Sequence, residues 1–210
     1  MADDYLRQSP LAHLHLDARA LADEALGDAG VTLTELRHRD MINLRGDAKD
    51  ADFHGAVKTA LGADLPPGTN VSAPARGGAQ VLALGPDEWL IVTDAGKGDA
   101  LAARLAKGLS AFHAAVTPVG EGRTTIRLAG ANAPDVLAKG CTIDLHPDHF
   151  GPGHCAETLI ARTGALIHGV KPKRGEGHAF EIVIAASFAE YLWTWLEDAS
   201  REYGVRVTTD

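Results

Sequence analysis

The sequence predicts an α+β fold made of two related half-domains of mainly antiparallel strands with helices. The stretches Met41–Gly68 and Arg127–Ala161 share an order of strand end, glycine, short helix, glycine, leucine and turn, roughly eighty residues apart. Pro86 and Asp87 suit the central positions of a type I turn between two apolar strands, which predicts a hairpin. Hairpins mixed with helices favour the α+β class over strict strand–helix alternation.

The first half is expected at residues 31–120, after an N-terminal arm at residues 1–30. The arm is rich in leucine but broken by glycines, so we expect it to lie on a partner rather than on its own core. Within the first strand, Glu35 alternates onto the same side as Val31 and Leu33. Apolar faces at helical spacing predict helices at Asp52–Leu61 and Asp99–Leu109. Runs of apolar and β-branched residues predict strands at Val31–Leu36, Met41–Leu44, Gln80–Leu84, Trp89–Val92 and Ala114–Val119.

The second half is expected at residues 121–210. A short helix is predicted between the cap Asn132 and a glycine stop at Gly140, with Pro134 in its first turn. Ser187 and Glu190 have the spacing of a capping box that opens a last helix. Strands are predicted at Thr124–Leu128, Glu157–Arg162, Ala165–Val170, Phe180–Ala185 and, as an edge strand, Val205–Val207.

The last helix has two candidate faces. We expect the core face to consist of Phe188, Tyr191, Leu192, Trp195 and Ala199, which share helical spacing. Trp193 then points nearly the other way. A large aromatic residue on an outer helix face is typical of a contact with another chain, so Trp193 is a candidate subunit contact.

Composition and charge narrow the class of protein. Hydrophobic residues at 45% and charged residues at 23% are ordinary for a soluble globular chain, and a net charge of −8 argues against non-specific nucleic-acid binding. The first ten residues lack the basic and apolar regions of a secretory signal, and no apolar run reaches the length of a membrane span. We therefore expect a cytoplasmic protein.

Cysteines and histidines cluster in one Pro/Gly loop, where zinc is the metal they would favour. The spacing contains no C-x-x-C pair, so we interpret the cysteines as buried core residues and the histidines as surface residues. We therefore predict no metal site on this chain. A cysteine–histidine nucleophile is less favoured still, because no base or oxyanion turn is recognisable. The residues concerned are Cys141, His146, His149, His154 and Cys155.

Other catalytic and binding patterns are also weak. The neighbouring acids Asp87 with Glu88, and Asp144 with Asp148, are explained by turns and caps. Two glycine-rich stretches, 76–78 and 174–177, do not join a strand to a helix as a nucleotide-binding loop does. We predict no catalytic residues and no cofactor-binding residues on this chain.

Several longer stretches together resemble one family, the gamma subunits of heterotetrameric sarcosine oxidase. They are LGPDEWLIV (84–92), GRTTIRLAG (122–130), the segment from Leu137 to Ala161 that contains GCTIDLHP, and FEIVIAASFAEYLWTWL (180–196), with SPLAHL near the start. The resemblance implies a fold similar to the folate-binding domain of aminomethyltransferases. It also implies membership of a complex that oxidatively demethylates sarcosine to glycine, forming hydrogen peroxide and formaldehyde or a tetrahydrofolate-linked one-carbon unit.

The same resemblance implies a non-catalytic, structural subunit. It further implies that FAD, FMN, NAD and zinc are held by other subunits of the complex, and that the alpha, beta and delta chains are the partners of this one. We expect the contacts to involve Trp193, the HPDHFGPG loop and the N-terminal arm. The named candidates are Trp193, His146, His149, Phe150, Leu11 and Leu14.

Three alternatives remain open. One is the equivalent subunit of a sister complex such as an N-methylglutamate dehydrogenase, whose substrate would bind another chain. A second is a free-standing folate-binding protein of the aminomethyltransferase-like or the iron–sulfur-repair type. The latter uses K-G-C-Y-x-G-Q-E; Lys139, Gly140 and Cys141 match this motif, but Thr142, Asp144 and Leu145 depart from it. The third is a small zinc enzyme that uses the His/Cys loop.

Overall fold

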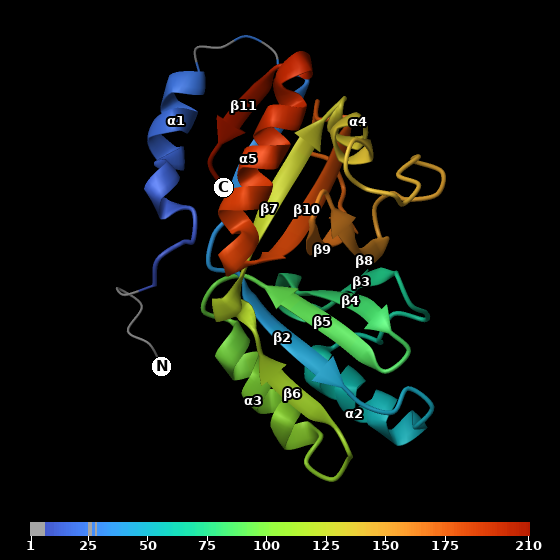
Figure 1. The fold of residues 1–210 in the computed structure, drawn as a ribbon. Helices are drawn as coiled ribbons and strands as arrows, with labels where there is room; N and C mark the ends of the chain where they lie inside the picture. Colours follow the sequence, from blue (N-terminus) through green and yellow to red (C-terminus); the bar gives the residue numbers. More distant parts are fainter. Residues whose placement is uncertain (1–6, 25–26, 28) are drawn as a thin grey trace. The chain divides into compact units, whose positions relative to one another are not determined.

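The computed structural model describes residues 7–24, 27 and 29–210 (Figure 1). By its internal contacts the chain divides into two compact units. Unit 1 comprises Met1–His38, Gly122–Pro152 and Glu157–Asp210, and unit 2 comprises Arg39–Glu121 and Gly153–Ala156. Each unit has its own sheet and is described separately below.

Unit 1 is built on a six-stranded sheet in the order β11-β1-β7-β10-β9-β8. In this sheet β1 pairs with β7, β7 with β10 and β10 with β9 in antiparallel fashion, while β1 and β11 run parallel. The helix α4 contacts β7, β10 and α5, while α1 lies beside β11 (Figure 1). The strands are β1 (Val31–Leu36), β7 (Arg123–Gly130), β8 (Cys155–Ile160), β9 (Thr163–Gly169), β10 (His178–Ala185) and β11 (Val205–Thr208). The helices are η2 (Ala12–Leu14), α1 (Leu16–Asp23), α4 (Ala133–Ala138), η5 (Ala186–Phe188), α5 (Ala189–Ser200) and η6 (Arg201–Tyr203).

Unit 2 is built on a five-stranded sheet in the order β3-β4-β5-β2-β6. The predicted hairpin is confirmed: β4 and β5 pair in antiparallel fashion across Pro86–Asp87. The strands are β2 (Asp40–Arg45), β3 (Ser72–Pro74), β4 (Gln80–Gly85), β5 (Glu88–Thr93) and β6 (Ala115–Pro118). The helices are α2 (Ala51–Leu61), η3 (Arg76–Gly78), α3 (Gly98–Gly108) and η4 (Gly120–Gly122).

The core of unit 2 joins one face of this sheet to α2 and α3. Ile42, Leu44 and Ile91 from the strands belong to one buried cluster with Val57 and Leu105 from the helices. The Asp50 side chain accepts hydrogen bonds from the first-turn amides of α2, and Gly62 ends that helix in the left-handed conformation, φ 68°. The cap of this helix is therefore Asp50, two residues before the predicted start at Asp52, and its C-terminal stop is the glycine that follows Leu61.

The N-terminal segment differs from the expected arm. Residues 7–24 pack on unit 1: Leu11, Leu16 and Ala20 are buried, and Asp23 accepts a hydrogen bond from the Val207 amide of the edge strand β11 at 2.8 Å. The α1 side chains thus cover one edge of the sheet, which is a common way to block unwanted strand pairing. The arm was predicted to include residues 1–6, 25, 26 and 28 as well, and these lie outside the described residues.

One local signal was misread. The capping box is wrong, because η5 occupies Ala186–Phe188 and α5 begins only at Ala189, without a side-chain cap. Gly140 directly follows the C-cap Lys139 of α4, as predicted, and a Cβ there would lie 2.5 Å from the Trp195 ring, so close packing also requires glycine. In the part of the chain that the structure describes, no helix has the length and apolar character needed to cross a bilayer.

Candidate functional site

The assignment of Trp193 to an outer helix face is wrong. Trp193 is fully buried, and the buried stripe of α5 is Ala189, Leu192, Trp193, Leu196 and Ser200. Two of the residues expected in the core are instead on the surface: Phe188 is 50% exposed and Tyr191 is 40% exposed. Both stripes have helical spacing, so periodicity alone could not choose between them; packing on the sheet decides. A fully buried indole offers no surface to another chain.

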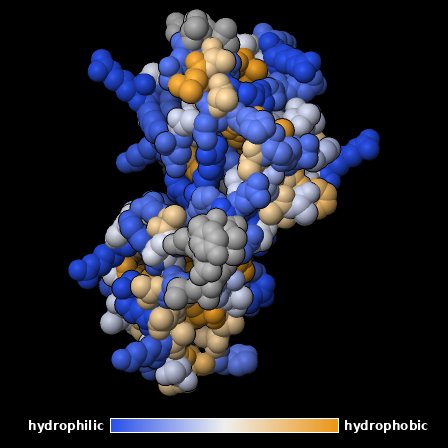
Figure 2. Space-filling model, turned by 90° about the vertical axis from the view of Figure 1, so that its left-hand side faces the viewer, coloured by the Kyte–Doolittle hydropathy of each residue, from blue (hydrophilic) through white to orange (hydrophobic). Residues whose placement is uncertain are grey.

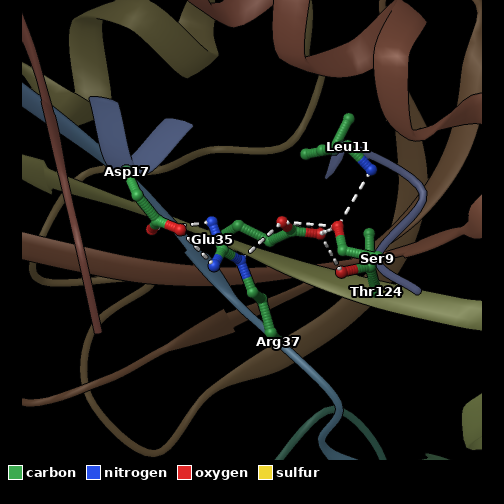
Figure 3. A network of polar contacts seen from close by, with 6 residues as sticks. All are labelled: Ser9, Leu11, Asp17, Glu35, Arg37 and Thr124. Carbon is green, nitrogen blue, oxygen red and sulfur yellow. Dashed lines mark hydrogen bonds and ion pairs between the residues drawn. The ribbon is translucent and has the colours of Figure 1, made fainter. Parts of the chain in front are cut away.

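Leu11 is likewise buried, and it is held in place by a polar network around Glu35 (Figure 3). The Ser9 hydroxyl donates to the Glu35 carboxylate, with Oγ 2.6 and 2.7 Å from the two oxygens, and accepts from the Leu11 amide at 2.9 Å. Thr124 on β7 donates to the same carboxylate at 2.9 Å. The Glu35 side chain therefore ties the N-terminal segment to β1 and β7.

Arg37 extends this network to the start of α1. Its Nε lies 3.3 Å from Glu35, and its two terminal nitrogens donate to the Asp17 carboxylate at 2.9 Å each. The hydrogen bond from Arg37 lowers the pKa of Asp17, against the opposing effect of desolvation. The same hydrogen bond raises the pKa of Arg37. A bidentate pair of this kind fixes orientation as well as charge. Leu14, the second arm candidate, is partly exposed and stays available to a partner.

Sequence reasoning missed this network, although one signal was visible. Glu35 occupies the same side of its strand as Val31 and Leu33, which are both buried. An acid on the apolar side of a strand needs hydrogen-bond donors when it is buried. Nothing in the spacing indicated that Ser9 would supply one of them.

The loop after α4 combines one anchor with two exposed histidines. Phe150 is buried, with its ring centroid 6.3 Å from that of Phe180 on β10. His146 and His149 are exposed, and Asp144 bonds both the His146 amide, at 3.0 Å, and the His149 ring. The backbone hydrogen bond from His146, followed by the contact with His149, lowers the pKa of Asp144. The loop therefore exposes two imidazole rings, while Phe150 and the hydrogen bonds to Asp144 hold its backbone in place.

The two cysteines have separate and buried environments. Cys141 Sγ lies 3.9 Å from the Thr158 hydroxyl in unit 1. Cys155 Sγ donates to the backbone oxygens of Val71 and Ala83 in unit 2, at 3.5 and 3.8 Å. Both therefore behave as small core residues. Across residues 7–24, 27 and 29–210, no three His, Cys, Asp or Glu side chains gather as a metal site would need.

The remaining acidic and basic candidates also have structural partners. Glu88 accepts from Asn43 at 2.7 Å and from Arg45 at 2.6 Å across the sheet of unit 2. The basic loop 171–178 is anchored by Glu176, which receives two hydrogen bonds from Arg127, at 2.9 and 2.8 Å. Burial would raise the pKa of Glu176, but the bonds from Arg127 and the Lys173 amide outweigh it and lower that pKa. This ion pair ties the loop to β7, while Lys171, Lys173 and Arg174 remain exposed.

Comparison with known proteins identifies the family. The profile of the sarcosine oxidase, gamma subunit family matches residues 45–202. The chain belongs to the sarcosine oxidase gamma subunit family. A sarcosine oxidase subunit gamma from Arthrobacter sp. is 34% identical over 198 residues, which cover 94% of this chain and 92% of that relative. The predicted resemblance is confirmed.

Solved structures agree with this family and its fold. A chain of the heterotetrameric sarcosine oxidase from Corynebacterium sp. U-96, in complex with pyrrole 2-carboxylate, is 33% identical with a TM-score of 0.81, covering 94% of this chain and 96% of that one. Aminomethyltransferase T of the glycine cleavage system from Bartonella henselae has a TM-score of 0.72 at 22% identity, covering 97% of this chain and 59% of that one. The α+β fold of the gamma subunit family thus resembles the aminomethyltransferase fold, as predicted.

Proposed function

We propose that this chain is the gamma subunit of a heterotetrameric sarcosine oxidase and that its role is structural. The observation that carries the proposal is the similarity to a chain of the Corynebacterium sp. U-96 heterotetramer along nearly the full length of both chains. In the proposed complex, alpha, beta and delta subunits hold FAD, FMN, NAD and zinc and convert sarcosine to glycine. The gamma chain supports that assembly without contributing a catalytic residue.

The thiols and the buried carboxylate, which are the side chains most suited to catalysis, are engaged within the fold, and this supports a structural role. Both thiols are buried, and the Cys155 thiol hydrogen bonds to backbone oxygens. Among the described residues, the most enclosed carboxylate is that of Glu35, and it is already bound by two hydroxyls and a guanidinium. A catalytic acid, base or nucleophile needs access to a substrate, and these groups have their hydrogen-bonding capacity engaged within the fold.

Two exposed aromatic residues, Phe188 at the N-cap of α5 and Tyr191 in its first turn, form the surface that we assign to subunit contact. Phe188 and Tyr191 lie three residues apart, which puts them on one side of the helix start. Aromatic residues are enriched at interface centres, and a two-ring patch is compact enough to fill a partner pocket. The exposed His146 and His149 of the 144–150 loop form a second, polar candidate contact.

The proposal is tested by isolating the tagged chain from its native cells and determining the masses and the visible spectrum of what co-purifies. We expect three further chains, flavin absorbance and sarcosine-dependent peroxide formation. A colourless, solitary chain of 22.0 kDa that binds tetrahydrofolate would contradict the proposal and favour a free-standing folate-binding protein. Turnover of N-methylglutamate in place of sarcosine would assign the chain to a sister complex.

The contact surface is tested by the double variant Phe188→Ser/Tyr191→Ser. We expect reduced recovery of the other chains while the thermal midpoint of the isolated variant stays near that of the wild type. Leu21→Ser is the matched control, because Leu21 is an apolar side chain on α1 that is 69% exposed. Undiminished recovery with the double variant would remove this surface from the proposed interface.

A further inference from the structure

A cavity of about 360 Å³ opens in unit 1 where two neighbouring strands separate. The β9–β10 pairing runs from Phe180 opposite Gly169 to Val183 opposite Leu166, and no pairing is recorded beyond it. Both strands continue, β9 back to Thr163 and β10 on to Ala185. The cavity, which we call the β9–β10 cleft, is lined by Arg123, Glu157, Thr158, Gly164, Ala165, Leu166, Val183, Ile184 and Ala185.

The β9–β10 cleft has one cation that lacks a partner. Arg123 lies at the start of β7, directly opposite Ala185, and is partly buried. Within the part of the chain that the structure describes, no side chain or backbone oxygen forms a hydrogen bond or ion pair with the Arg123 guanidinium. A guanidinium is always charged and offers several donors in a fixed plane, which fits a carboxylate. The unused donors of Arg123 therefore face a ready-made cavity.

A second unpartnered polar group lies next to Arg123. Thr125 is two residues further along β7, hence on the same face of the sheet, and it stands opposite Val183 of the cleft. Its hydroxyl is buried and has no hydrogen-bond partner among the described residues. Buried hydroxyls are nearly always satisfied in folded proteins, but Thr125 does not line the cleft, so the Arg123 guanidinium is the charged anchor that the cleft offers to a ligand.

The apolar residues that line the cleft favour a ligand with an apolar body. Leu166 and Val183 are directly opposite one another and share the face that carries Arg123. The only other charged lining residue, Glu157, comes from β8. Since β7 and β8 are separated by β10 and β9, Glu157 is about three strand spacings, or ~14 Å, from the β7 side. A second negative charge on a ligand would meet Glu157, which disfavours polyanions.

We propose that the β9–β10 cleft binds a small monocarboxylate with a compact apolar body. The carboxylate lies on Arg123, and the apolar body covers Leu166 and Val183. Clefts for small ligands have this character, being mainly apolar with a few polar groups that fix orientation, and they begin near the present volume. The proposal goes beyond the subunit role and does not depend on it, because every lining residue belongs to unit 1 of this chain.

The test is a titration of the purified full-length chain with benzoate, followed by calorimetry or by saturation-transfer NMR. Benzamide, which has the same shape and no charge, is the matched probe. We expect saturable benzoate binding, at least about tenfold tighter than benzamide, since a charge-assisted hydrogen bond to Arg123 is lost with the neutral ligand.

Two cleft variants and one control variant test whether binding takes place in the β9–β10 cleft. Arg123→Gln should weaken benzoate binding at least about tenfold, while Arg174→Gln, in an exposed loop, should leave it unchanged. Gly164→Val should abolish binding by filling the cleft; a Cβ there meets nothing within 4 Å, so the fold tolerates it. Absence of saturable benzoate binding, or equal binding by the wild type and both cleft variants at unchanged thermal midpoints, would overturn the proposal.

Discussion

Replacing Ser9 by alanine should release the N-terminal segment from unit 1. The Ser9 hydroxyl is the only group that links the Glu35 carboxylate to the Leu11 amide among the described contacts (Figure 3). A hydrogen bond to a charged group contributes about 1.5–3 kcal/mol to stability. Because Glu35 keeps its bonds to Thr124 and Arg37, we expect the lower part of that range, about 2 kcal/mol.

The loss is measured by thermal unfolding of the purified chain. For a chain of 210 residues, a loss of 1 kcal/mol lowers the midpoint by about 2–4 °C, so Ser9→Ala should lower it by about 4–8 °C. Hydrogen exchange gives a local measure, since the Leu11 amide loses its acceptor and should exchange faster. Ser187→Ala is the matched control, because Ser187 is exposed and makes no recorded side-chain bond.

The reasoning is refuted if Ser9→Ala changes the midpoint no more than Ser187→Ala does and leaves the exchange of the Leu11 amide unaltered. That result would mean that water replaces the Ser9 hydroxyl at no cost. The Glu35 network would then fill space around the segment without holding it.

Three further outcomes follow from the packing and the charges. Gly46→Ala should destabilise the chain by about 1–3 kcal/mol, because its Cβ would lie 2.3 Å from the Phe53 ring, whereas Gly55→Ala, in open space within α2, should stabilise it by about 0.5–1 kcal/mol; chemical denaturation distinguishes the signs. Trp193→Ala should lower the free energy of unfolding by about 3–5 kcal/mol, because it removes a fully buried ring. A loss below about 1 kcal/mol in the same measurement would mean that the Trp193 side chain lies on the surface. The folded-state pKa of Glu176 is lowered, so its contribution is complete above the ordinary glutamate pKa of about 4.3 and is lost as pH falls through the lower folded value; Glu176→Gln should therefore flatten the acid limb of the stability–pH curve, and an unchanged limb would contradict the role of this pair.

The surface carries only small apolar patches on the side shown in Figure 2. The side of the molecule that it shows is mainly hydrophilic, with hydrophobic patches interspersed among polar residues (Figure 2). Small apolar patches suit a contact of a few aromatic anchors better than a broad apolar interface. Phe188 and Tyr191, which we propose as a subunit contact, would supply two such aromatic anchors.

Local chemistry in the sequence was enough for the fold class and most elements. The Pro86–Asp87 turn, the Asp50 side chain that caps α2 and the left-handed Gly62 depend on residues within a few positions of each other. Such signals act in the same way in any fold, because backbone geometry and near-neighbour hydrogen bonds set them. The family resemblance was also readable, since it rests on ordered stretches of sequence.

Tertiary structure decided which faces are buried and which polar groups meet. On α5, two stripes had equal helical spacing, and only packing on the sheet placed Trp193 inside and Tyr191 outside. Ser9 and Glu35 are 26 positions apart, and Arg127 and Glu176 are 49 apart, so no local pattern could pair them. The sequence by itself determined the elements and the family, because these depend on near neighbours; the tertiary structure determined the buried faces and long-range ion pairs, because these depend on which distant elements pack together.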